Sequence, residues 1–237
     1  MTVKFPRAVL AALLVAAAAA CHGQSTDDAA FGARVRAYLL DHPEVLQETA
    51  KRLDAKLAET EAAVERHGRA QLPRLRVALE RDPEDFVAHP NGAVTVTEFY
   101  DYRCPHCVNA APRVVALIRG HPNVRFVFKE MPIFGPVSEH AARAALAVKT
   151  IDGDYLGVYM TFMATRGLND ETIDAVARQK GVIAVPAANP HLARNAAVFT
   201  QLGLGGTPAF VVGDQIIYGD DMDAVEAAVA RAAPARL

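Results

Sequence analysis

The 237-residue sequence predicts an α/β protein with an inserted helical region and an N-terminal helical extension. Two stretches rich in β-branched and aromatic residues, 93–100 and 124–130, flank one helical stretch, which is the order of a parallel βαβ unit. Residues 138–202 then show mainly helical periodicity, and residues 31–82 combine helical periodicity with many charges. With 51% hydrophobic residues a large core is expected, and the net charge of −2 makes nucleic acid a poor choice of partner.

The first segment has the pattern of a secretory signal peptide, which we place at residues 1–20. Lys4 and Arg7 precede an apolar run of 13 residues, Ala8–Ala20, and small residues follow. Such a run is too short to cross a bilayer comfortably as a helix. The sequence therefore predicts export, and it predicts a polar tether at residues 21–30.

Cys21 follows three alanines, and this stretch resembles the lipobox of bacterial lipoproteins, in which the cysteine is lipidated and becomes the first mature residue. The match is imperfect, because leucine is usual where Ala18 stands. Two outcomes stay open: lipidation at Cys21, which would tether the protein to a membrane, or ordinary cleavage near Ala20.

Residues 31–82 predict a short helix that ends near Leu40 and a second helix that starts around Asp41–Pro43. Gly68 and Pro73 predict a bend or break in this second helix. Six of its positions, alternately four and three apart, form a heptad-like stripe: Leu46, Ala50, Leu53, Leu57, Thr60 and Val64. Two interpretations stay open, an amphipathic helix of the same domain and an oligomerisation stalk.

The domain that carries the chemistry is predicted to begin at residue 83. After the strands and the helix of the βαβ unit, the sequence predicts helices at residues 139–150, 155–164, 170–179 and 191–202. Gly203 is expected to end the last of them. A β-hairpin turning at Gly213-Asp214 and a closing helix over residues 222–232 complete the prediction.

Cys104 and Cys107 are three residues apart, where the first strand gives way to the helix. A zinc site needs four ligands, and the sequence has no second cysteine pair. A disulfide that closes so small a loop stabilises a fold little. A redox-active dithiol is favoured, because the free N–H groups at a helix start stabilise a thiolate at Cys104.

The two residues between the cysteines support this interpretation. Pro105 suits the first turn of a helix, and His106 can carry a positive charge or donate a hydrogen bond that favours the Cys104 thiolate. Stabilising the thiolate makes the disulfide form a stronger oxidant. Cys107 lies one turn into the helix, within reach of a mixed disulfide at Cys104.

The stretches "FYDYRCPHC" and "GTPAFVVG" resemble the DsbA-type branch of the thioredoxin superfamily, and the resemblance covers residues 93–237. It implies a thioredoxin fold in which residues 138–202 are the inserted helical domain. It also implies that Cys104 is the nucleophile, that Cys107 is the resolving thiol, and that Thr207 and cis Pro208 bind an extended substrate segment. The redox group would be the Cys104–Cys107 disulfide itself, with no separate cofactor and no metal.

Two charged residues are further candidates. Glu98 stands six residues before Cys104, where the family carries a buried acidic residue that assists proton transfer. Its alternation with Thr97 and Phe99 leaves its face undecided. Lys129 could pair with Glu98 across neighbouring strands and modulate its pKa, and a solvated lysine is the equal alternative.

The stretch "VRAYLLDHPEVLQ" resembles the N-terminal region of ScsC-like, copper-tolerance-associated proteins, some of which trimerise through it. Threonine before the cis proline resembles the isomerases DsbC and DsbG. We therefore predict a periplasmic or envelope thiol–disulfide oxidoreductase, with isomerase activity placed ahead of pure oxidase activity. Its expected partners are unfolded or misfolded envelope proteins, a membrane redox protein that recycles the dithiol, and copies of itself (a trimer or dimer through residues 31–82).

Two alternatives stay open. One is a monomeric DsbA-like oxidase, and the other is a non-enzymatic lipoprotein that binds copper(I) through two soft thiolates.

Overall fold

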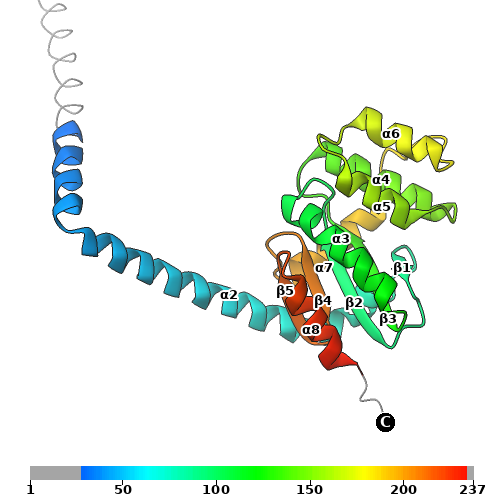
Figure 1. Ribbon diagram of the computed structural model, residues 1–237, viewed down its shortest axis with the longest axis horizontal. Coiled ribbons are helices and arrows are strands. Elements are labelled where there is room, and N and C mark those ends of the chain that lie inside the picture. Colours follow the sequence, from blue (N-terminus) through cyan, green and yellow to red (C-terminus); the bar gives the residue numbers. More distant parts are fainter. Residues whose placement is uncertain (1–27, 234–237) are drawn as a thin grey trace, which may run out of the picture. The chain divides into compact units, whose positions relative to one another are not determined.

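The computed structural model describes residues 28–233, so the predictions for the signal peptide and Cys21 lie outside the described residues. The chain divides into two compact units, of which the first ends at Glu61 and the second begins at Ala62 (Figure 1). Among the described helices, none is both long enough and apolar enough to cross a membrane.

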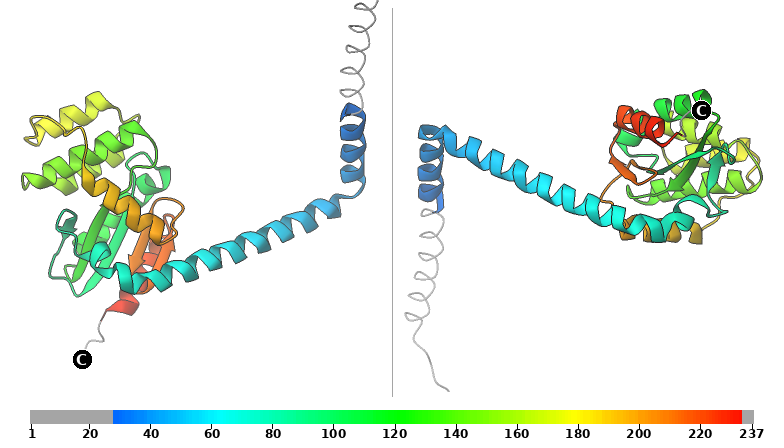
Figure 2. Two further views of the ribbon diagram at one scale, coloured as in Figure 1. Left: turned by 180° about the vertical axis from the view of Figure 1, so that it is seen from behind. Right: turned by 90° about the horizontal axis from the view of Figure 1, so that it is seen from below.

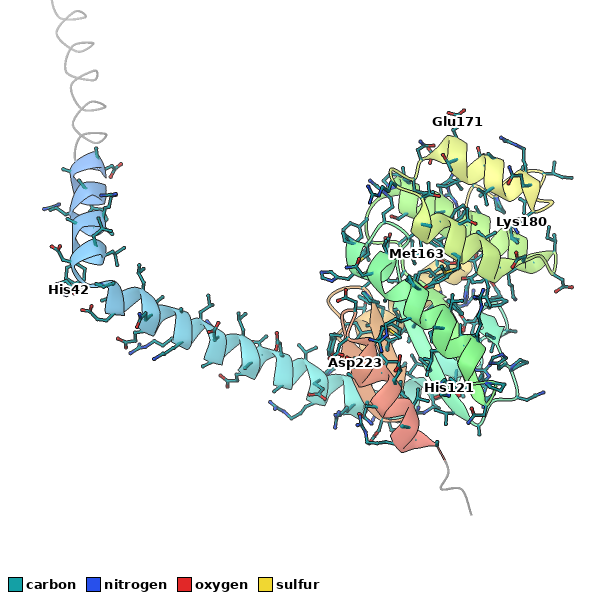
Figure 3. The ribbon with its side chains drawn as sticks, in the orientation of Figure 1. His42, His121, Met163, Glu171, Lys180 and Asp223 are labelled. Atoms are coloured by element: carbon teal, nitrogen blue, oxygen red, sulfur yellow. The ribbon has the colours of Figure 1, made fainter. Side chains whose placement is uncertain are left out.

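The described part of the first unit is helical and exposed. Residues 28–41 form one helix, and α2 (Pro43–Glu80) begins after His42, as predicted. Every side chain of residues 28–61 is exposed or half-buried, and side chains project from α2 on several sides (Figure 3). Leu46, Leu53 and Leu57 of the predicted stripe are 54%, 55% and 51% exposed. The first unit therefore lacks a hydrophobic core of its own within residues 28–61.

α2 continues through both predicted interruption points, which corrects the sequence-based expectation of a break. Pro73 lies inside the helix, and Leu72, Leu75 and Leu79 around it are buried. Burying one leucine stabilises a fold by roughly 1.5–3 kcal/mol, and three outweigh the roughly 3 kcal/mol that proline costs inside a helix. At Gly68 a Cβ atom would lie 2.8 Å from the carbonyl oxygen of Leu202, so the glycine permits close packing.

Because of this packing, the boundary between the two units lies inside α2. We predicted that the second domain begins at residue 83, whereas the structure places residues 62–80 of α2 in the second unit. The leucines that fix α2 to the sheet recur every three or four residues, but the sequence does not show which surface they meet.

A five-stranded sheet in the order β1-β3-β2-β4-β5 forms the centre of the second unit. β2 (Val94–Tyr100) and β3 (Val124–Glu130) are parallel and joined by α3 (Pro105–Gly120), which confirms the predicted βαβ unit. β4 (Ala209–Val212) and β5 (Gln215–Tyr218) form the predicted hairpin. β1 (Phe86–Ala88) pairs antiparallel with β3 and was not predicted, because three residues carry too little periodicity.

Helices cover both faces of this sheet (Figure 2). The remaining helices are α4 (Pro136–Thr150), α5 (Tyr155–Ala164), α6 (Asp170–Gln179), α7 (Pro190–Gln201) and α8 (Met222–Ala232). The larger core joins one face of the sheet to α3, α4, α5 and α8, and a second core joins the other face to the end of α2 and to α7. The helical insertion thus lies between β3 and β4, and the cysteine pair opens the helix that follows β2.

Candidate active site: a dithiol at the start of α3

Cys104 is the N-cap residue of α3, and Pro105 is the first residue of the helix. The backbone N–H of Cys104 donates to the carbonyl oxygen of Asp101 (3.2 Å), and the Cys104 carbonyl accepts from Val108 (3.0 Å). Cys104 and Cys107 are 2% and 0% exposed, and both are free thiols. The structure therefore shows the reduced dithiol at a helix start, where unpaired N–H groups favour an anion.

The surroundings of Cys104 lower the pKa of its thiol to about 5. The largest cause is the hydrogen bond that the Cys107 thiol donates to the Cys104 sulfur, and the Thr207 side chain acts in the same direction. The backbone N–H groups of Cys107 and His106 add to this, while burial opposes it. Cys104 is consequently a thiolate at neutral pH, which is the reactive form.

Cys107 has the opposite character. Burial raises the pKa of its thiol far above the usual range, and its hydrogen bond to Cys104 and the charge of Glu98 raise it further. The backbone N–H of Asp101 lies 3.5 Å from its sulfur. The pair thus holds one ionised, reactive sulfur beside one protonated sulfur. A nucleophile and a resolving thiol would need these two different protonation states.

The Thr207–Pro208 peptide bond is cis and lies beside Cys104. The Cys104 sulfur lies 3.0 Å from the carbonyl oxygen of Thr207, to which it donates a hydrogen bond only in its protonated form. Residues more than 100 positions apart in the sequence therefore meet at one sulfur, between the start of α3 and the start of β4.

Glu98 lies in the core, with 0% of its surface exposed. Burial raises the pKa of its carboxyl group to about 8; the Tyr159 hydroxyl lowers this pKa and the charge of Glu130 raises it. The charge of Glu98 in turn acts on Cys107. The structure thus decides the face that the sequence left open and places a carboxyl group with a raised pKa near Cys107.

Lys129 does not modulate Glu98, which corrects the prediction that paired the two. Lys129 is opposite Phe99 in the register of β2 and β3, and Glu98 is opposite Phe128, so the two side chains point to opposite faces. Nor is Lys129 solvated: it is 1% exposed, forms a 2.6 Å ion pair with buried Asp85, and donates to the carbonyl oxygen of Ala78.

The ring of His106 forms its hydrogen bond with Asp220. Its Nδ1 atom hydrogen-bonds Asp220 Oδ1 (3.1 Å), and the Asn109 amide donates to the other oxygen of Asp220 (3.3 Å). His106 acts on Cys104 through its backbone N–H. The predicted thiolate-stabilising role of the ring therefore does not operate through direct contact in this structure.

Sequence reasoning missed Asp101, which ties the active-site turn to the loop after β3. Its carboxylate accepts hydrogen bonds from four groups: the backbone N–H of Arg103 (2.7 Å), Ile133 (2.7 Å) and Phe134 (2.9 Å), and the Ser138 hydroxyl (2.8 Å). Three of these donors lie more than 30 positions away in the sequence, so the sequence gives no local signal for this role.

The pKa of Cys104 leads to a pH prediction. The rate of iodoacetamide alkylation at Cys104 should rise through a midpoint near pH 5 and stay constant at neutral pH. Below the midpoint the thiolate fraction, and with it the rate, falls tenfold per pH unit. Peptide mass spectrometry should find the label on Cys104 and not on Cys107. A midpoint near 8.5, where ordinary cysteines titrate, would contradict the thiolate assignment.

Comparison with known families gives two matches. Residues 95–230, more than half of the chain, match the family described as a DSBA-like thioredoxin domain. Residues 27–59 match the family described as the copper resistance protein ScsC N-terminal domain. The two matches fall on the two segments for which the sequence suggested the same resemblances.

Three of the similar solved structures illustrate the extent of the likeness. A thioredoxin-like oxidoreductase from Silicibacter pomeroyi DSS-3 is 37% identical, with a TM-score of 0.61, and the match covers 66% of this chain and 96% of that one. BcfH from Salmonella enterica Typhimurium is 27% identical (TM-score 0.63; 91% and 99% covered). A periplasmic thioredoxin-like protein from Salmonella enterica serovar Typhimurium is also 27% identical (TM-score 0.60; 67% and 95% covered).

A curated relative is much longer than this chain. The Na(+)/H(+) antiporter NhaA 3 of Salinispora tropica is 31% identical over 144 residues, which are 56% of this chain and 21% of that protein. The chain thus spans about a fifth of the curated relative that it matches, and the likeness concerns one part of it.

Proposed function

Because the chain belongs to the DSBA-like thioredoxin domain family of thiol–disulfide oxidoreductases, we propose that it exchanges disulfides in proteins of the cell envelope. The observation that carries the proposal is the pairing of a Cys104 thiolate with a protonated Cys107 beside the cis Thr207–Pro208 bond. The redox group is the Cys104–Cys107 pair, with Cys104 as nucleophile and Cys107 as resolving thiol.

The exchange runs in two steps. The Cys104 thiolate attacks a client disulfide, a bond forms between its sulfur and one client sulfur, and the other client sulfur leaves with the electron pair. Cys107 then passes its proton to the carboxylate of Glu98 and attacks Cys104, which releases the first client sulfur as a thiolate and leaves the Cys104–Cys107 disulfide. When the client takes the disulfide, the steps reverse and Glu98 returns the proton.

Client binding is assigned to the strand edge at Thr207 and Pro208. The family places an extended client segment there, paired with the backbone of the residue before the cis proline. The 3.0 Å contact of Cys104 with the Thr207 carbonyl supports the assignment, because a segment bound there would place its sulfur beside the nucleophile.

Isomerase activity is favoured over oxidase activity on account of the first unit. Residues 27–59 match the ScsC N-terminal domain, and the described part of this unit has exposed leucines and no core of its own. An apolar pocket where the two helices meet adds to the exposed surface, with Phe31, Val35, Leu39, Leu40 and Leu46 among its lining residues. We infer that the occupant of this surface is a second copy of the chain, which would bring several active sites to one client.

The test is a double substitution on the stripe, Leu53→Glu with Leu57→Glu, in the full chain. These charges should dissociate the oligomer in sedimentation experiments, and recovery of scrambled ribonuclease should fall severalfold, while simple insulin reduction is retained. The matched control is Ala55→Glu with Ala58→Glu, which adds the same charge at exposed positions off the stripe. A wild-type monomer would favour the oxidase alternative.

A second candidate function is copper(I) binding by the two thiolates. The match to the copper resistance protein ScsC N-terminal domain is the reason to consider it. One Cys104 thiolate beside a Cys107 thiol that resists ionisation is a poor soft-ligand pair at neutral pH. Copper titration in parallel with the exchange assay separates the two functions, because a copper carrier would bind stoichiometrically without turning over disulfides.

The periplasm or cell envelope is the proposed location. One of the similar structures is a periplasmic protein, and the signal-peptide pattern of residues 1–20 points the same way. Lipidation at Cys21 and recycling by a membrane redox protein belong to the same proposal. Mass spectrometry of the mature N-terminus would show whether Cys21 carries lipid.

A further inference from the structure

A second buried carboxyl group lies on the same face of the sheet as Glu98, and the exchange steps described above do not use it. Glu130 ends β3 and is 1% exposed. In the parallel register of β2 and β3, Glu98 is opposite Phe128 and Glu130 is opposite Tyr100. Because side chains alternate along a strand, both glutamates point to the face that α5 covers.

Tyrosine hydroxyls surround Glu130. Tyr155 donates to its Oε1 atom at 2.6 Å, and Tyr102 donates to the same oxygen at 3.1 Å. The Tyr100 hydroxyl joins these two tyrosines, 2.6 Å from Tyr155 and 3.0 Å from Tyr102. The anionic form of Glu130 therefore has a network of donors ready to stabilise it.

The anionic form of Glu98 has fewer hydrogen-bond donors to stabilise it than that of Glu130. It accepts one long hydrogen bond, 3.5 Å from the Tyr159 hydroxyl. The Oε2 atoms of Glu98 and Glu130 both lack a hydrogen-bond partner, and no cation of residues 28–233 pairs with either carboxyl group. Two unpaired charges in so dry a site cost too much to form together near neutral pH.

The two groups therefore titrate in sequence. Burial, joined at Glu98 by the charge of Glu130, raises the pKa of both to about 8. As the pH rises, the proton leaves Glu130 first, because the tyrosines stabilise its anion, and the new charge opposes ionisation of Glu98. Other ionisable groups also face the two glutamates. They come from the end of β2 and the turn after it, from α3 and from α5, and they are Tyr100, Asp101, Tyr102, Cys107, Tyr155 and Tyr159.

We propose that Glu130 is a positioning residue for disulfide exchange: its charge holds a proton on Glu98, and Glu98 passes that proton to and from Cys107. The inference rests on the proposed exchange function. When a client thiolate opens the disulfide, a bond forms between its sulfur and Cys104, the Cys104–Cys107 bond breaks, and its electron pair stays on the Cys107 sulfur. The Glu98 proton then moves to that sulfur. Glu130 neither gains nor loses a proton in this step and acts only through its charge.

The direct test is a carbon-13 NMR titration of the Glu98 carboxyl in the reduced full chain, with and without Glu130→Gln. Glutamine keeps the shape, and its amide oxygen still accepts from Tyr155 and Tyr102. We expect the Glu98 midpoint to fall by about one pH unit, since a close like charge is removed. A Glu98→Gln chain identifies the resonance.

A kinetic readout follows the same proton. Resolution of a mixed disulfide at Cys104 requires Cys107 to deprotonate, so its rate should rise as Glu98 ionises. In Glu130→Gln this rise should move to lower pH by the same amount. In a Glu98→Gln background the Glu130 substitution should change nothing, because the group through which it acts is gone.

An unchanged Glu98 midpoint in folded Glu130→Gln would overturn the inference, and so would an effect of Glu130 that persists in the Glu98→Gln background. If Glu130→Gln fails to fold, Tyr155→Phe replaces it: removing one donor makes Glu130 harder to ionise and should shift Glu98 in the same direction by less. If no variant exchanges disulfides but the midpoint shifts, the proposed function fails and the coupling stands.

Discussion

Replacing Cys104 by serine should abolish disulfide exchange, with a rate loss of at least about 1,000-fold in insulin reduction. Serine cannot be ionised at neutral pH and forms no bond with sulfur, so the first step is lost. The proposed client binding at Thr207 and Pro208 would not replace this step. The fold should be retained, because Cys104 caps α3 through backbone contacts and its side chain makes no cap hydrogen bond.

Cys107→Ser should behave differently and serves as the matched comparison. Cys104 can still attack, because the serine hydroxyl can donate to its sulfur in place of the Cys107 thiol, which is the largest cause of its lowered pKa. The mixed disulfide then has no resolving thiol, and client-bound protein should accumulate on non-reducing gels. Substantial turnover by Cys104→Ser, or free release from Cys107→Ser, would show that the division of roles is wrong.

The sequence predicted those features of the fold that depend on local periodicity. The bounds of β3, α5, α6 and α8 agree with the predictions. The thioredoxin fold with inserted helices, which the resemblance to the DsbA-type branch implied, is confirmed together with the N-terminal helical extension. β1 was missed because it is short. The continuity of α2 through Pro73 was missed because it depends on leucines packing against a sheet formed later in the chain.

The same distinction applies to the site. The cysteine pair and the Thr207–Pro208 loop are local motifs, and both could be found in the sequence. The roles of Lys129, Asp101 and Glu130 depend on strand register and on partners distant in the sequence, which no local pattern encodes. The direction of the His106 ring is likewise set by Asp220, more than 100 residues away.

Replacing Lys129 by methionine should lower the free energy of unfolding of the reduced protein by about 3–5 kcal/mol, measured by urea denaturation. The ammonium group is 2.6 Å from Asp85 in a site where both side chains are at most 1% exposed. Its loss leaves the Asp85 carboxylate buried, with the His191 ring as its remaining partner at 2.9 Å. Removing one member of a buried pair costs far more than the pair itself contributes.

A solvent-exposed pair supplies the matched control. Lys180 is 2.8 Å from Asp154, with side chains 31% and 60% exposed, and Lys180→Met should cost less than about 1 kcal/mol. If Lys129→Met costs no more than this control, the buried pair does not stabilise the fold as argued.

The Lys129 variant also separates stability from catalysis. Lys129 lies on the face of the sheet opposite to Glu98, so Lys129→Met should leave the pH profiles of Cys104 alkylation and of mixed-disulfide resolution unchanged in the folded protein. A shifted profile would mean that Lys129 acts on Glu98 after all, which was one of the two sequence-based alternatives. An unchanged profile combined with a large loss of stability would assign proton control to the Glu98 face and structural support to the opposite face.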